Sequence, residues 1–308
     1  MKVHFSNVDF QSRSGPNTFA GRLAKTLQKR GYEFVGPNDD YETFLAFIEP
    51  ASHPRPGAKF LQRLDGIWFS PEDFHEKNRG IRWTYNNCHY VIWQTQFDKN
   101  MTNHHWGDRP GTVIANGIDL SENRIIDENI INLRNQYDKI FVCSSNWHGQ
   151  KRLMDNTNLF LKYEHENPDQ KCCLVVMGDS PDHMIRKDNV LYTGNINHHL
   201  CLQMFRAADW MLHLAWLDHC PNVVVEALSQ GCPVVCSSSG GTKEIVKNSG
   251  LVVPEIEEYD YRLTDYTNPP KLDLSNIALP STIEVDNKHL DIEIVADKYD
   301  LALRALWD

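Results

Sequence analysis

The sequence is poor in the features that mark several common classes of protein. It has only 8 cysteines in 308 residues and no Cys-x-x-Cys pair, so neither a disulfide scaffold nor a cysteine zinc site is indicated. No window approaches the roughly 20 uninterrupted apolar residues that span a bilayer, and the first ten residues lack an apolar stretch of signal-peptide length. We therefore expect a cytoplasmic protein with reduced cysteines and no transmembrane segment, and we leave peripheral membrane contact open.

Basic residues are also few. The 31 Lys and Arg stand against 41 Asp and Glu, which gives a formal net charge of −10. This balance argues against nucleic acid as a partner, although a local basic pocket can still hold one small anion. A Gly-x-Gly-x-x-Gly turn is missing after the first apolar run, where residues 14–19 read Ser-Gly-Pro-Asn-Thr-Phe. A dehydrogenase with a dinucleotide-binding turn is therefore disfavoured.

The chain is long and apolar enough for two domains, since 41% of its 308 residues are hydrophobic. Each half begins with a short apolar run, a loop of small residues and a helical pattern, which predicts an α/β protein with parallel sheets. The predicted strands are 1–5, 43–48, 59–64, 90–93, 112–115, 139–143, 173–177, 190–192, 210–214 and 233–236. We expect domains at 1–120 and 121–254, followed by a tail, 255–308, whose final helix (292–307) packs its apolar face on the body.

The most informative segment runs from Trp210 to Val246. Pro221 suits the first turn of a helix and Gly231 suits the position after its end, so a helix is predicted over residues 221–230. Its first amides, at Asn222 and Val223, would form a positively polarised end that can bind a phosphate.

Two acidic residues flank this predicted anion site. Asp218 precedes the helix and Glu226 lies about one turn inside it. Ionised carboxylates there can accept the vicinal hydroxyls of a ribose or a hexose. Taken alone, such a pair more often has ordinary roles, with Glu226 complementing the helix dipole and Asp218 capping the helix.

The whole segment resembles the nucleotide-sugar signature of family 4 retaining glycosyltransferases of the GT-B fold. The matches are Glu226-Ala227, Gly231-Cys232-Pro233-Val234-Val235 and Gly240-Gly241-Thr242-Lys243-Glu244-Ile245-Val246, with Asp218 in place of the usual first Glu. The resemblance covers about residues 1–254 and implies two Rossmann-like domains whose parallel sheets face each other across a cleft. It also implies that Glu226 binds the ribose of a nucleoside diphosphate sugar and that Asp218, with the amides after it, addresses the donor sugar.

Other segments fall in the order of the family. Ser14-Gly15-Pro16 is similar to its loop near the donor phosphate, residues 113–119 to the segment that closes its N-terminal domain, and Gly194 to its strand-end glycine beside the base. Asp65 stands where the family often has a His-Asp pair facing the donor sugar, and His219 beside Asp218 is a further polar candidate.

The diphosphate contacts of the family are matched only in part. Lys151 stands where the family has its Lys, whereas Asn146 takes the place of the usual Arg. Arg152, His148 or backbone amides are the candidates to replace that Arg. Since Lys151 follows a predicted strand and loop, its ammonium is placed where open α/β sheets put ligand-binding groups.

We therefore expect a retaining, hexosyltransferase-type enzyme that moves a sugar from a nucleoside diphosphate sugar to an unidentified glycan, lipid or small molecule. Its catalytic candidates are Asp218, Lys151, Glu226 and Asp65. It is expected to need no metal or cofactor, because Lys151, Arg152 and the helix end would stabilise the leaving diphosphate.

Two other functions compete with this one. A glycosidase would use Asp218 and Glu226 as its carboxylates, but it leaves the phosphate-binding features without a role. A nucleotide-sugar-binding module that has lost turnover is favoured by the departures at Asn146 and Asp218.

Overall fold

The structure is a computed structural model in which residues 1–12, 15–120, 126–179 and 184–307 are described. The chain forms two compact units. Unit 1 comprises Met1–Asp119, Asp260–Thr264 and Lys288–Asp308, and unit 2 comprises Leu120–Tyr259 and Asp265–Asn287. Residues 255–308, expected as a tail, thus contribute to both units. Within the described residues, no helix has the length and apolar character needed to cross a membrane.

Unit 1 contains a parallel six-stranded sheet in the order β2-β1-β3-β4-β5-β6. Its central strand β3 is buried along its whole length, as expected for a parallel strand covered on both faces. The strands are β1 (Lys2–Ser6), β2 (Glu33–Phe34), β3 (Thr43–Phe47), β4 (Lys59–Leu64), β5 (Tyr90–Trp93) and β6 (Gly111–Val113). The helices are α1 (Gly15–Gln28), α2 (Phe74–Lys77), α3 (Arg79–Asn87), α4 (Gln96–Trp106), η2 (Lys288–Leu290) and α10 (Ile292–Arg304).

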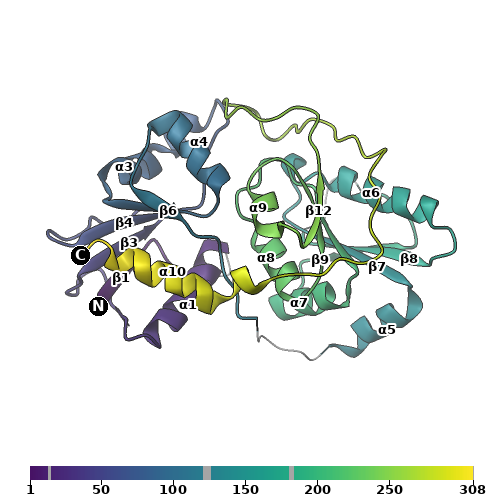
Figure 1. Ribbon diagram of the computed structural model, residues 1–308, viewed down its shortest axis with the longest axis horizontal. Helices are drawn as coiled ribbons and strands as arrows, with labels where there is room; N and C mark the ends of the chain where they lie inside the picture. The colour runs from purple at the N-terminus through teal and green to yellow at the C-terminus, as the bar shows by residue number, and fades with distance from the viewer. Residues whose placement is uncertain (13–14, 121–125, 180–183, 308) are drawn as a thin grey trace. The chain divides into compact units, whose positions relative to one another are not determined.

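The last helix, α10, packs beside the first helix, α1, within unit 1 (Figure 1). Its apolar face joins the core around α1 and β1 through Ile292, Val295, Tyr299 and Leu303. A short parallel bridge between Ile118 and Asp291 fixes the start of the helix. The C-terminal helix therefore completes the hydrophobic core of the N-terminal unit.

Unit 2 contains a second parallel six-stranded sheet, in the order β12-β11-β10-β7-β8-β9. The strands are β7 (Lys139–Ser144), β8 (Cys172–Met177), β9 (Val190–Gly194), β10 (Trp210–His213), β11 (Val234–Ser237) and β12 (Gly250–Val253). The helices are α5 (Glu128–Gln136), η1 (Gly149–Lys151), α6 (Leu153–Glu166), α7 (His198–Ala207), α8 (Asn222–Ser229) and α9 (Thr242–Val246).

The strand order of unit 2 reverses between β7 and β10. From β7 the chain adds β8 and β9 on one side, and it then returns to add β10, β11 and β12 on the other side. The loops that follow β7 and β10 lie at this reversal, and open α/β sheets bind their ligands at such points.

The predicted fold class is confirmed: both units alternate strands and helices around parallel sheets. Strands β2 and β12 were not predicted, because β2 has two residues and β12 begins with a glycine. Helix α1 begins at Gly15, so Gly15 and Pro16, which were compared with a loop of the family, belong to a helix. Pro221 is the N-cap residue of α8 rather than a member of its first turn.

Two leucines of α10 provide a matched test of its packing. Leu303 is fully buried, whereas Leu301 is 69% exposed. We expect Leu303→Ala to lower the free energy of unfolding by about 2–5 kcal/mol, because the truncation leaves a cavity in the core of unit 1. Leu301→Ala is expected to change it by less than about 0.5 kcal/mol. Urea denaturation followed by circular dichroism measures both, and equal effects would contradict the packing of α10 on the core of unit 1.

Candidate functional site

The predicted donor-site residues of unit 2 gather at the carboxyl ends of its strands. Lys151 ends η1, which follows β7, and Asp218 lies in the loop that follows β10. These are the two strands between which the strand order reverses. Glu226 lies in α8, the helix after that loop. Residues distant in sequence thus meet at the edge of the sheet where ligands bind in this type of fold.

Lys151 and Asp218 form a close ion pair. The Lys151 Nζ donates to Asp218 Oδ2 at 2.5 Å, and the side chains are 16% and 13% exposed. Burial alone would raise the pKa of the Asp218 carboxyl, but the Lys151 ammonium and the His213 ring together lower that pKa well below its usual range. Asp218 is therefore ionised at neutral pH.

His213 is the third member of this cluster and was missed by the sequence analysis. It is the last residue of β10, its side chain is 4% exposed, and its Nε2 lies 3.1 Å from the same Oδ2 of Asp218. Because a carboxylate only accepts hydrogen bonds, neutral His213 must carry its proton on Nε2. The sequence signal for His213 was its position near the end of an apolar run. That signal does not distinguish a site residue from a histidine of the core.

The loop between β10 and Asp218 is held by the segment around Gly240. Leu217 has a left-handed φ of 52°, and its amide donates to Ser239 Oγ at 3.2 Å. The amide of Gly241 donates to the carbonyl of Asp218 at 2.8 Å. Gly240 has a φ of +70°, and a Cβ there would lie 2.4 Å from the Asp218 carbonyl oxygen. The Gly-Gly pair thus allows the close approach that positions Asp218.

Helix α8 presents the predicted anion-binding end beside this loop. Pro221 O accepts from the amides of Val224 and Val225, so hydrogen bonding within the helix begins one turn after Pro221, beyond Asn222 and Val223. Glu226, which is 7% exposed, accepts from His198 Nε2 through its Oε1 at 3.0 Å. The predicted ribose-binding carboxylate is therefore held in place by the first residue of α7.

Comparison with known proteins adds to this geometry. Residues 138–264, which include Lys151, Asp218 and Glu226, match the family model described as Glycosyl transferases group 1. No curated protein matches the chain.

Several solved structures share the architecture along the whole chain. The crystal structure of Anabaena Alr3699/HepE in complex with UDP and glucose is 16% identical with a TM-score of 0.66, and the alignment covers 99% of this chain and 100% of that one. Sucrose-phosphate synthase from Thermosynechococcus elongatus is 14% identical with a TM-score of 0.67, covering 100% and 99%. The glycosyltransferase WaaG is 13% identical with a TM-score of 0.58, covering 100% and 93%. The fold of this chain is GT-B.

In this GT-B fold, Arg152 belongs to unit 2 with most of the donor-site candidates, but its side chain is part of the buried structure. Its side chain is 1% exposed, and its two terminal nitrogens donate to Glu255 at 2.6 and 3.0 Å. One of them also donates to the carbonyl of Pro270 at 2.7 Å. The Arg152 guanidinium, which was a sequence candidate for binding the diphosphate, is paired with a buried carboxylate in this structure.

The remaining candidates of unit 2 lie at the same edge of its sheet. Asn146 is exposed in the loop after β7, and His219 is half-buried next to Asp218. Gly194 ends β9 with a φ of +64°, and its carbonyl accepts from the amide of Gly178 at 3.0 Å. These positions place the three residues near the carboxyl ends of β7, β10 and β9, respectively.

Two candidates belong to unit 1. Gly15 is the first residue of α1, and Ser14 before it lies outside the described residues. Asp65 directly follows β4 and pairs with Arg63, whose side chain is fully buried. The Arg63 guanidinium also donates to Asn116 Oδ1 at 2.6 Å. Asp65 is thus fixed at the carboxyl end of a strand in its own unit.

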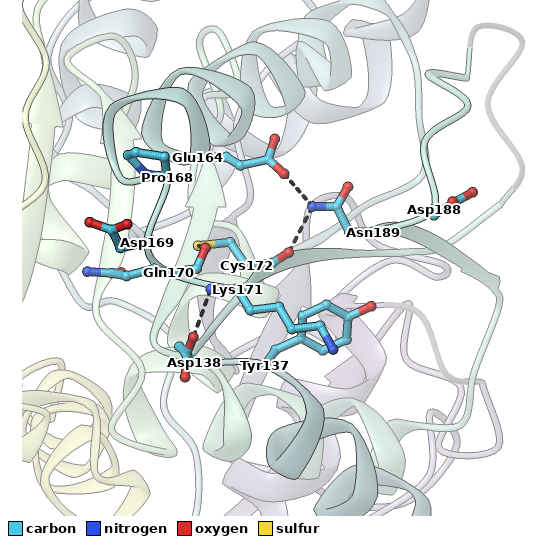
Figure 2. A pocket seen from close by; sticks show the side chains of 10 residues that line it. All are labelled: Tyr137, Asp138, Glu164, Pro168, Asp169, Gln170, Lys171, Cys172, Asp188 and Asn189. Carbon is cyan, nitrogen blue, oxygen red and sulfur yellow. Dashed lines mark hydrogen bonds between the residues drawn. The ribbon is translucent and has the colours of Figure 1, made fainter.

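A groove at the opposite edge of the unit 2 sheet is distinct from this site. Its cavity volume is about 520 Å³, and it is lined by residues that precede β7, β8 and β9, such as Asp138, Lys171 and Asn189 (Figure 2). Asn189 donates to Glu164 and to the carbonyl of Cys172, and the Lys171 amide donates to Asp138. In the part of the chain that the structure describes, no group of three or more His, Cys, Asp or Glu is placed to hold a metal ion.

The buried Arg152–Glu255 pair should stabilise unit 2. We expect Arg152→Met to lower the free energy of unfolding by about 3–5 kcal/mol, because it leaves the Glu255 carboxylate buried without its counter-charge. Arg262→Met removes a pair with Asp260 in which both side chains are more than half exposed, at 68% and 59%, and should cost less than about 1 kcal/mol. Chemical denaturation compares the two, and similar costs would show that Arg152 is not a structural clamp.

Proposed function

We propose that this chain is a glycosyltransferase that takes a sugar from a nucleoside diphosphate sugar bound to unit 2. We further propose that it retains the configuration of the sugar and uses neither a metal nor a cofactor. The acceptor is a glycan, a lipid or a small molecule. UDP is the first nucleotide to test, because it is present in a solved structure that shares the fold.

The Lys151–Asp218 pair carries this proposal. It lies at the strand reversal of unit 2, with Asp218 in the loop that leads into α8, and inside the stretch that matches Glycosyl transferases group 1. A cation and a helix N-terminus at the same edge of a sheet are suited to a diphosphate, whose charge grows as the bond to the sugar breaks. A glycosidase has no use for such a site.

Each residue of the site then has a separate task. The Lys151 ammonium and the amides at Asn222 and Val223 stabilise the leaving diphosphate. Glu226, oriented by His198, accepts hydrogen bonds from the ribose hydroxyls, and Asp218 contacts the donor sugar. Arg152 ties the end of η1 to Glu255 rather than holding the phosphates, because its guanidinium donates to that carboxylate.

The two halves of the donor site can be separated by calorimetry. Lys151→Ala removes a charge-assisted contact of about 1.5–3 kcal/mol, so UDP binding should weaken about 10-fold to 150-fold while uridine binding barely changes. Glu226→Ala should weaken both ligands, and 2′-deoxy-UDP should lose affinity on the native protein but little more on the variant. Lys171→Ala, in the groove at the opposite edge, is the matched control and should change neither.

The result for Lys151 has a clear contrary outcome. Equal losses for uridine and UDP would mean that Lys151 acts through structure, and the phosphate assignment would move to the amides of α8. Circular dichroism of each variant verifies that the fold is intact. No binding of any nucleoside diphosphate would overturn the proposed function.

A binding module without turnover is the second candidate, because Lys151 is already paired with Asp218 and Asn146 replaces the Arg of the family pattern. Incubation with a panel of nucleoside diphosphate sugars distinguishes the two. We expect slow donor hydrolysis even without acceptor, and we expect it to persist in excess chelator. Binding with neither hydrolysis nor transfer would favour the module. Loss on chelation that Mn²⁺ or Mg²⁺ restores would contradict the metal-free mechanism.

A further inference from the structure

One oxygen of Asp218 accepts hydrogen bonds from two groups. Its Oδ2 lies 2.5 Å from Lys151 Nζ and 3.1 Å from His213 Nε2. The proposed function draws on the same Lys151 ammonium to hold a diphosphate. Binding of the diphosphate would therefore bring negative charge close to Asp218. The Lys151 ammonium would then be shared between Asp218 and the phosphates, so a second positive charge beside Asp218 becomes more favourable.

His213 is the group placed to supply that charge. Strand β10 packs against β7, β11 and α8. Near its carboxyl end the ionisable groups of these elements are Cys143 on β7, Cys236 on β11 and Glu226 on α8. Burial raises the pKa of both thiols, that of Cys236 to about 12, so both are neutral. Glu226 is a carboxylate, which cannot supply a positive charge, and it accepts a hydrogen bond from His198.

We propose that His213 is a positioning residue of the donor site, which holds the Asp218 carboxylate and takes up a proton when a diphosphate engages Lys151. This inference rests on the proposed function. The proton comes from the solvent and is added at Nδ1, because Nε2 already donates to Asp218. The imidazolium then balances Asp218, and Lys151 can turn its other N–H groups to the phosphates.

Proton uptake can be measured by titrating UDP into the protein at pH 7.5 in two buffers of different ionisation enthalpy, PIPES and Tris. We expect the native protein to take up more protons than His213→Gln, whose amide can still donate to Asp218 but cannot titrate. His165→Gln, at an exposed position near the end of α6, is the matched control and should behave as the native protein. Protons exchanged by UDP itself cancel in this comparison.

The affinity for UDP gives a second readout. Between pH 6.5 and 8.5 the Kd of the native protein should rise with pH, by up to about tenfold per pH unit where one proton is coupled to binding. His213→Gln should show a shallower rise. A purely structural role would weaken binding by the same factor at every pH, and that result would overturn the proposal.

Nitrogen NMR of the histidine rings tests the proposal in the native protein, should His213→Gln fail to fold. His213→Asn then serves to assign the signal. We expect Nδ1 of His213 to become protonated at higher pH with UDP bound than without it. An unchanged midpoint overturns the role of His213 while leaving the donor site intact, whereas no UDP binding at all overturns the proposed function and this inference together.

Discussion

The parallel pairing of β7 with β10 is the constraint on which the candidate site depends. The register that sets Trp210 beside Phe141 and Met211 beside Val142 brings together two loops that are some seventy residues apart in the chain. From that pairing follow the contact of Lys151 with Asp218 and the approach of His213 to the same oxygen. The surrounding loops then keep this charge cluster in place, with Gly240 allowing a close backbone approach and Arg152 tying η1 to Glu255.

Much of the fold could be predicted because its strands are short apolar runs of the length that a parallel sheet buries. Strands such as Lys59–Leu64 and Tyr90–Trp93 coincide with the predicted ranges. Two edge strands were not predicted because their residues carry too little apolar pattern. Strand β2 has only two residues, and β12 starts at Gly250, where an added Cβ would lie 1.9 Å from Val234 O. An edge strand of this kind is defined by its neighbour rather than by its own sequence.

The sequence motifs could identify individual residues of the site. They could not show which side chains these residues contact, and those contacts decide their roles. The sequence singled out Lys151, Asp218 and Glu226, but it could not show that Lys151 and Asp218 touch, that His198 holds Glu226, or that His213 faces Asp218. Arg152 illustrates the same limit. Beside Lys151 in the sequence it has the character of a phosphate-binding residue, yet its left-handed backbone, with a φ of 50°, turns the side chain toward Glu255 instead.

The position of α10 in unit 1 also bears on how the chain acquires its structure. The core around β1 and α1 needs Tyr299 and Leu303, which lie beyond all of unit 2 in the sequence. A ribosome making this chain from the N-terminus would release unit 1 with its apolar face uncovered until unit 2 had been synthesised. Residues 1–119 are made before unit 2 but would reach their final stability after it, and they would depend longest on protection from aggregation.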